Sequence, residues 1–454
     1  MDVFFVFFLT LLFLFILGYL RKLPVFVVLI LGAIFFGLLA GAGLDSTLLW
    51  MASGMGSIFT GFAIAILSGI VIVRLLFDQG LLDVMARGIH ARVKNTRASS
   101  GILAFILSVP ITCPVVTYAM LSPVLKRLEP EKARANMLLY VAATCAIVSY
   151  IVIFPTPFTQ PLASTFAPDI SWGVLDLITI PIALCLLFLV IAVAGWWSRS
   201  SFRKSGQEAE ATGLSAAPTL SGTSGEAHGS AGEPVIPLSR HLKAWAPFIA
   251  IIVSIPVGHF ILGLSHGAIL QFIMLVGLLV ALLLAPQEIR MSGFSSGVKT
   301  AGLVIVDICA AGAIGTVVVR SGLANSALAT LTPVLPDILI PFIIAAILAT
   351  AQGSRVTTAV VTAQVIGATT LINEINPLPL ILMVAAGSCI VCHVTDPFFH
   401  LVRNTTGDDT RTVLKNYTLP LACVGVVLFI VALALAGFVF PYNENAALAM
   451  MTGV

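Results

Sequence analysis

Long apolar stretches dominate the chain, and most of them run for about 17 to 25 residues, the length that a helix needs to cross a hydrocarbon core of about 30 Å. These windows lie near residues 3–20, 24–43, 57–77, 135–153, 174–197, 245–264, 268–285, 300–319, 378–392 and 416–440. The pattern predicts an all-α polytopic membrane protein.

Two further apolar windows, residues 98–125 and 335–372, are interrupted near their middles. The first is broken by Pro110 and Pro114, and the second by the run Gln352-Gly353-Ser354. Irregular backbone is tolerated at membrane depth only where it lines a cavity inside the protein. Each window therefore predicts a re-entrant helical hairpin or a broken helix near the midplane.

Composition excludes a water-soluble fold, because 59% of the 454 residues are hydrophobic and only 9% are charged. The net charge of +3 is small and its basic residues lie in loops, so no nucleic-acid partner is expected. Residues 198–243 are rich in Ser, Gly, Ala, Thr and Glu without hydrophobic periodicity, which predicts a flexible cytoplasmic linker. The linker separates a first transmembrane repeat, 1–197, from a second, 244–454.

The basic residues define a topology. Arginines and lysines cluster in alternate loops, whereas the loops at 44–56, 154–173, 265–267 and 321–334 contain none. If the two broken windows are hairpins, every loop obeys the positive-inside rule, with five full spans per half and both termini outside. Residues 80–97 then form a basic amphipathic helix on the inner surface of a multi-pass protein of the cell (inner) membrane.

The two halves also repeat in sequence. Val141–Tyr150 parallels Val384–His393, and Val71–Arg74 resembles Val317–Arg320. An odd number of spans separates equivalent segments, so the repeats should face opposite ways, as in many secondary transporters. Chance similarity between apolar segments is the alternative.

Four helix breaks offer hydroxyls, amides and helix N-termini that suit an anionic or polyhydroxylated ligand. They are Pro110–Pro114, Phe154–Pro161, Gln352–Thr358 and His393–Pro397. The candidate substrate-binding residues are Thr112, Thr156, Thr159, Gln160, Gln352, Gly353, Ser354, Arg355, Thr357, Thr358 and Thr395.

Arg355 follows a Gly-Ser break inside an apolar window, where a charge must be paired or must face a cavity. Its guanidinium suits bidentate binding of a carboxylate. The alternative is a structural ion pair with an acidic residue such as Asp307 or Asp396.

Three residues are candidates for coupling transport to protons. Asp307 lies in an apolar segment and can carry a proton, although it can equally be a fixed partner of Arg320 or Arg355. His393 and Asp396 form the second candidate pair, because imidazole titrates near neutral pH. A structural histidine is the simpler alternative there.

No cofactor or metal is expected. The run Cys389–His393 matches the attachment pattern of c-type haem, but it lies inside an apolar span and the equivalent run of the first half lacks the cysteine pair. The seven cysteines are interpreted as reduced packing residues. A membrane-embedded enzyme using His393 and Asp396 lacks a nucleophile beside them, and a channel would need no closing hairpins.

At these breaks the chain resembles the gluconate permease family, proton symporters for gluconate and related small carboxylates within the ion transporter superfamily. The resemblance covers nearly the whole length. It rests on Leu23-Pro24, Met51–Gly56, Cys309–Gly315 with Ser321-Gly322, Gln352–Ser354 with Thr357-Thr358, and Ala386–Ser388 followed by His393–Asp396.

The resemblance implies a permease that carries out proton-coupled symport of gluconate or another sugar acid or carboxylate across the plasma membrane, with a sodium-coupled carboxylate transporter as the alternative. It also implies a homo-oligomer, dimeric or larger, whose hairpins close over the substrate. The chain departs from the family at Phe154–Phe158, Arg355 and Thr395. A more compact or more highly charged organic anion would suit the added arginine.

Overall fold

A computed structural model of the chain describes residues 3–20, 23–129, 131–211, 237–323, 326, 330, 333, 335–390 and 396–439. Within these residues the chain forms helices and no strands, which confirms the all-α class. Six helices are long and apolar enough to cross a bilayer: Leu44–Asp78, Lys132–Val152, Gly173–Gly195, Leu238–Ile261, Gln287–Arg320 and Thr410–Val439. Shorter apolar helices complete a multi-pass membrane protein.

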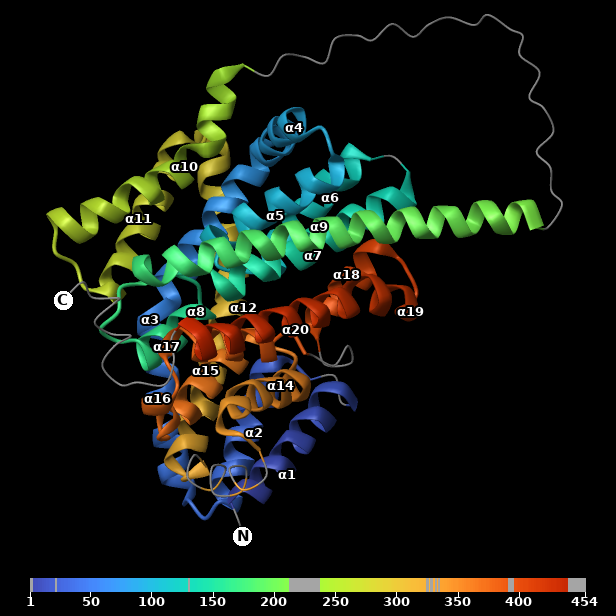
Figure 1. Ribbon diagram of the computed structural model, residues 1–454. Helices are drawn as coiled ribbons and strands as arrows, with labels where there is room; N and C mark the ends of the chain where they lie inside the picture. Colours follow the sequence, from blue (N-terminus) through green and yellow to red (C-terminus); the bar gives the residue numbers. More distant parts are fainter. Residues whose placement is uncertain are drawn as a thin grey trace, which may run out of the picture.

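The first half, drawn from blue to green in Figure 1, is built from nine α-helices and one π-helical turn within the described residues. They are α1 (Val3–Phe15), η1 (Ile16–Leu20), α2 (Val25–Leu39), α3 (Leu44–Asp78), α4 (Leu81–Val93), α5 (Thr96–Ile111), α6 (Pro114–Leu128), α7 (Lys132–Val152), α8 (Thr159–Phe166) and α9 (Trp172–Ala211).

The second half is drawn from yellow to red. Its described elements are α10 (Leu238–Pro256), η2 (Val257–Ile261), α11 (His266–Leu284), α12 (Gln287–Arg320), η3 (Asp337–Leu339), α14 (Ile340–Gln352), α15 (Arg355–Gly367), α16 (Leu371–Glu374), α17 (Pro377–Gly387), α18 (Pro397–Thr406), α19 (Thr410–Val413), η4 (Leu414–Thr418), α20 (Leu419–Ala434) and η5 (Leu435–Val439).

Both interrupted windows form pairs of helices joined by a two-residue break. Helices α5 and α6 are separated by Thr112 and Cys113, and α14 and α15 by Gly353 and Ser354. In the first half α7 follows the pair and ends before α8, and in the second half the short helix α16 and then α17 follow, with α17 ending before α18. The predicted interruptions therefore lie where the helices end.

The long helices α3 and α12 pack along each other through glycines. A Cβ added at Gly312 would lie 2.6 Å from the carbonyl oxygen of Gly54, and one added at Gly297 would lie 2.9 Å from Cα of Val71. As the contact moves along α3 from Gly54 to Val71, it moves backwards along α12, so the helices are antiparallel. Small residues permit this close approach, as is common in membrane proteins.

The antiparallel arrangement of α3 and α12, which hold equivalent places in the two halves, agrees with inverted repeats at this one element. The inversion of the complete halves and their boundaries at 197 and 244 stay predictions. Both helices are longer than expected from their apolar windows. Helix α3 begins at Leu44, within the segment predicted as a loop at 44–56.

Helix also covers both ends of the segment predicted as a linker. In Figure 1 the green helix α9 runs out of the bundle and ends at Ala211, while α10 begins at Leu238. The linker between 198 and 243 stays a prediction, with helix at both of its ends. Residues 212–236 lie outside the described part of the chain. Most of the segment 80–97 is helical as α4, which contains Arg87 and Arg92, and its position on the inner surface stays a prediction.

Candidate functional site

The two hairpins share the same backbone conformation at their breaks. Thr112 and Gly353 end their helices in the left-handed region, with φ, ψ of 59°, 14° and 67°, 0°. The next residues, Cys113 and Ser354, are extended. Left-handed backbone is easy for glycine but strained for threonine, at a cost on the order of 1 kcal/mol or more. Such strain at Thr112 is typical of functional segments.

The second hairpin is stabilised by its own hydroxyl groups. Ser354 Oγ accepts hydrogen bonds from the backbone N–H of Thr357 at 3.3 Å and from its hydroxyl at 2.9 Å. The Thr358 hydroxyl donates to the Ser354 carbonyl at 2.9 Å. These three candidate residues therefore hold the start of α15 in place, and the hydroxyls of Thr357 and Thr358 are already engaged. The side chain of Gln352 lies outside the described part.

Arg355, the first residue of α15, forms a buried ion pair with Asp396. Its Nη2 lies 3.4 Å from Asp396 Oδ2, and their side chains are 6% and 1% exposed. Tyr417 from η4 completes the group: its hydroxyl donates to Asp396 Oδ2 at 3.0 Å and accepts from Arg355 Nη2 at 3.4 Å. Of the two partners that the sequence allowed for a structural pair, Asp396 is the one found.

Asp396 also begins a helix. Its Oδ1 accepts the backbone N–H of Phe398 at 2.9 Å, so it is the N-cap of α18. Arg355 and Asp396 thus bring the N-termini of α15 and α18 together. Since helix N-termini favour negative charge, the ends of both helices, together with the guanidinium, create an environment suited to an anion.

The break between α7 and α8 is closed by two threonines. Thr156 and Thr159 exchange hydrogen bonds from backbone N–H to hydroxyl oxygen, each at 3.0 Å, and Thr156 Oγ1 donates to the Tyr150 carbonyl at 2.8 Å. The N–H of Phe154 donates to Asp176 of α9 at 2.9 Å. Both threonine hydroxyls therefore serve the backbone of the break in this conformation.

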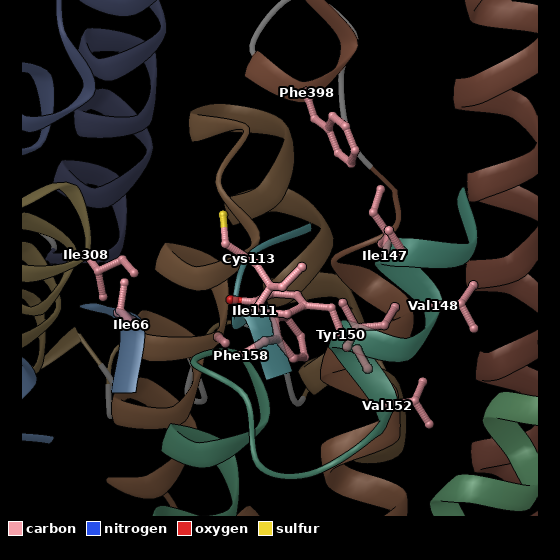
Figure 2. Packing of buried hydrophobic residues seen from close by; sticks show 14 of the residues in the cluster. Ile66, Ile111, Cys113, Ile147, Val148, Tyr150, Val152, Phe158, Ile308 and Phe398 are labelled. Carbon is pink, nitrogen blue, oxygen red and sulfur yellow. The ribbon is translucent and has the colours of Figure 1, made fainter. Parts of the chain in front are cut away.

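The breaks lie close together in space. Figure 2 shows Ile111 and Cys113 of the first hairpin beside Tyr150 and Phe158 of the α7–α8 break, and the rings of Tyr150 and Phe158 are 6.3 Å apart. Helix α8, which follows this break, packs against α15 of the second hairpin. The ring centroid of Tyr118 in α6 lies 5.3 Å from that of Phe398 at the start of α18. The structure thus brings parts of all four predicted breaks together.

Several buried polar atoms near these breaks have no hydrogen-bond partner among the described residues. They include Thr112 Oγ1, Gln160 Oε1, Arg355 Nε, Thr362 Oγ1 and Gln364 Oε1. Helices α15 and α8 pack together, since a Cβ at Gly367 would collide with Thr165. Buried polar groups are normally satisfied, so a group of orphaned donors and acceptors on adjoining elements indicates a place for a polar ligand or water.

Asp307 has a different environment from the one expected of a partner of Arg320 or Arg355. Its Oδ1 accepts the backbone N–H of Phe26 at 3.1 Å, in the first turn of α2. No ion pair joins it to either arginine among the described contacts. Asp307 therefore holds the start of α2 against α12. His393 and Thr395 lie outside the described residues.

The sequence reasoning did not identify Tyr417 or Gln364. Tyr417 lies in a short polar run, Lys415-Asn416-Tyr417-Thr418, and it is fully buried. A buried tyrosine hydroxyl usually needs a partner, so this run was the available signal. Gln364 is a lone amide in an apolar helix, and a Cβ at Gly315 of α12 would collide with its Oε1.

Comparison with known proteins identifies the family. The sequence model of the GntP family permeases matches residues 2–439. The chain belongs to this family. It is 25% identical over 418 residues to the high-affinity gluconate transporter of Escherichia coli (strain K12), covering 88% of this chain and 90% of that protein. An uncharacterised permease of Haemophilus influenzae is also 25% identical over 426 residues, covering 88% and 85%.

Two solved transporters share the fold. Alcanivorax borkumensis YdaH aligns with a TM-score of 0.57 at 13% identity, covering 87% of this chain and 90% of that one. Neisseria gonorrhoeae MtrF, from a class of antimetabolite efflux pumps, aligns with a TM-score of 0.53 at 15% identity, covering 92% and 95%. At these identities the likeness concerns the fold alone.

Membership of the GntP family confirms the resemblance seen in the sequence. It makes the chain a membrane permease, a secondary transporter and not an enzyme.

Proposed function

We propose that this GntP family permease imports gluconate or a related small organic anion, a sugar acid or another carboxylate, across the cell (inner) membrane together with a proton. The named activity of the Escherichia coli relative supports the substrate class. The proposed substrate contacts are the guanidinium of Arg355 and the orphaned polar atoms of Thr112, Gln160 and Gln364.

One observation carries the proposal. Arg355 is buried, its Nε has no hydrogen-bond partner among the residues that the structure describes, and its contacts to Asp396 and Tyr417 are both long, at 3.4 Å. A guanidinium has five N–H donors in a planar fork that matches a carboxylate. A substrate carboxylate would therefore satisfy donors that the protein leaves free, beside two helix N-termini that favour its charge.

The same pair supplies a reason for coupling. When a substrate carboxylate binds Arg355, Asp396 shares its counter-ion with a second negative charge. A buried carboxylate without its own counter-ion is unfavourable when charged, so Asp396 would take up the co-transported proton. Tyr417 keeps the Asp396 side chain in place in both states through the bond between its hydroxyl and Oδ2. Release of substrate and proton restores the ion pair.

Uptake of radiolabelled gluconate into proteoliposomes tests the proposal. We expect an inward proton gradient to raise uptake at least tenfold, an inward sodium gradient to have no effect, and unlabelled glucose, which has no carboxylate, not to compete. Uptake driven by sodium but not by protons would instead support the sodium-coupled alternative. Accumulation that ignores both gradients would contradict coupled transport.

Variants at position 355 test the residue itself. Arg355→Lys keeps the positive charge but removes the planar fork, so we expect the KM for gluconate to rise at least tenfold while the protein still folds. Arg320→Lys is the matched control, because Arg320 is exposed at the end of α12. An unchanged KM in Arg355→Lys would rule out direct binding of the substrate by this fork.

A further inference from the structure

A cavity lies away from the Arg355 site, between α7, α9 and the segment that runs from η4 into α20. Its volume is about 270 Å³. Its walls run along α7 from Met137 to Thr144, along α9 from Leu189 to Ala194, and from Lys415 to Val427. Most of the lining side chains are apolar, and the polar ones are Tyr140, Thr144, Lys415 and Asn416. None of the candidate substrate-binding residues lines this cavity.

The cavity is placed to receive a ligand from the bilayer. Helix α7 is almost entirely buried and forms the inner wall, whereas few residues in the apolar windows of α9 and α20 are buried. Leu189, Val193 and Leu419, at the edges of the cavity, are exposed side chains of these two outer helices. An apolar cavity that opens between two lipid-facing helices suits a hydrocarbon chain.

One end of the cavity is basic. Lys415 belongs to the lining and its side chain is exposed. The guanidinium of Arg97 lies 3.8 Å from where a Cβ of Gly195 would be, next to the lining residue Ala194. Lys132 is the first residue of α7, and Arg411 lies just before α20. Both are therefore at the N-terminal ends of these helices. Basic pockets between membrane helices bind the anionic headgroups of lipids.

The cavity is also connected to the Arg355 site through the π-helical turn η4. Lys415 and Asn416 of this turn line the cavity, while Tyr417 of the same turn contacts Asp396 and Arg355. Single π-helical turns are rare and often occur at functional positions. A ligand in the cavity would thus touch the turn that positions Tyr417.

We propose that this cavity binds one anionic phospholipid, with an acyl chain between α7, α9 and α20 and the headgroup phosphate at Lys415. The apolar walls and the lipid-facing opening account for the chain, and the basic end accounts for the headgroup. The proposal rests on the membrane embedding of the permease and does not depend on which anion it transports.

Thermal unfolding of the purified full-length chain in neutral detergent tests the proposal. Ligands that bind only the folded state raise its Tm. We expect phosphatidylglycerol to raise the Tm by about 5 °C more than phosphatidylcholine with the same acyl chains. Equal shifts with the two lipids would overturn the proposal. A Tm that rises with protein concentration but does not respond to added lipid would also overturn the proposal, since a second copy of the chain would then fill the cavity.

Two variants assign the effect to the cavity. Lys415→Gln should remove the preference for phosphatidylglycerol, whereas Lys243→Gln, an equal charge change at an exposed position of α10, should keep it. Ala194→Leu fills the cavity without adding charge and should reduce the response to both lipids. Native mass spectrometry, which counts retained lipids, should show one phosphatidylglycerol fewer on Ala194→Leu. An unchanged lipid count, or a preference that survives Lys415→Gln, would refute the assignment.

Discussion

The two hairpins share one backbone geometry at their tips, but the breaks of the two halves contain different chemical groups. In the first half, the α7–α8 break is closed by the neutral hydroxyls of Thr156 and Thr159, and the first hairpin ends in Thr112 and Cys113. In the second half, the residues after the hairpin break and before α18 form the ion pair of Arg355 and Asp396. Repetition of the fold therefore does not impose repetition of the site.

This difference indicates that the two halves have different roles in the site. The first half supplies a neutral polar surface whose hydroxyls hold the backbone, and the second half supplies the charges that can distinguish an anion from a neutral solute. The asymmetry predicts that substitutions at charged groups of the second half have larger effects than substitutions at the matching neutral positions of the first.

The largest effect should follow removal of the Asp396 carboxylate. Asp396→Ala leaves the Arg355 charge buried without a partner and removes the cap of α18, so the free energy of unfolding should fall by about 3–5 kcal/mol. Gluconate uptake should be lost. Chemical denaturation in detergent micelles and proteoliposome uptake measure the two results.

The control is Asp78→Ala, which breaks the pair of Arg74 and Asp78 within α3. That pair is shorter, at 3.0 Å, but its side chains are 31% and 21% exposed. We expect a loss of less than about 1 kcal/mol and normal uptake. Equal losses in the two variants would mean that burial does not distinguish the pairs.

The next largest effect should come from Tyr417→Phe. It removes a hydroxyl that bonds both Asp396 and Arg355, and a hydrogen bond to a charged group contributes about 1.5–3 kcal/mol. We expect a loss in this range and a changed pH profile of uptake. Tyr140→Phe, which removes a bond of 2.6 Å to Asp408, controls for a lost tyrosine hydroxyl outside the site. An unchanged pH profile in Tyr417→Phe would separate this residue from coupling.

A smaller effect distinguishes the two hairpin tips. Gly353→Ala introduces a Cβ into left-handed backbone and should destabilise the protein by about 1 kcal/mol. Thr112→Ala keeps the existing strain and removes a hydroxyl that has no hydrogen-bond partner among the described residues, so it should leave stability nearly unchanged. If Thr112 contacts the substrate, the KM rises in this variant while the Tm does not. A fall in Tm for Thr112→Ala would instead make the hydroxyl structural.

The smallest effect concerns an exposed cap that can be compared with Asp396. Asp409 caps α19, and hydrogen bonds from Thr412 and Arg411 lower the pKa of its carboxyl below the ordinary value of 3.8. Its stabilising effect is therefore present above pH 4 and is lost as the pH falls through the lowered pKa. Asp409→Asn keeps a capping side chain that does not titrate.

Thermal unfolding between pH 6 and pH 3 measures this effect. We expect the wild type to be slightly more stable than Asp409→Asn near pH 6 and the difference to disappear at the acid end. A difference that grows as the pH falls would contradict the lowered pKa of Asp409.

The sequence predicted the class of fold and the positions of the breaks because both depend on local signals. Proline at 110 and 114 and the run Gln352-Gly353-Ser354 interrupt apolar windows wherever the rest of the chain lies. The start of α3 was missed because Met51–Gly56 has small and polar residues that lower its hydropathy. Gly54 is nevertheless helical, and it packs against Gly312 of the other half.

The partners in the site could be predicted only in part. Arg355 was identifiable because a charge inside an apolar window needs a partner, and Asp396 was one of two named possibilities. Tyr417 could not be assigned, since its contacts with Asp396 and Arg355 depend on how α20 packs against the hairpin. Asp307 failed as a partner of arginine because its contact is the backbone of Phe26, 281 positions away.

The glycine contact between α3 and α12 also has a consequence for biosynthesis. The ribosome completes α3 long before it makes α12. The surface around Gly54 therefore has no contact with Gly312 until the second half has been inserted into the membrane. Assembly of the bundle must then be a late, post-insertional step. Residues 1–211 and 237–454, synthesised as separate polypeptides in one cell, are accordingly expected to associate through this contact, and bulky side chains at Gly54 or Gly312 should prevent them from copurifying.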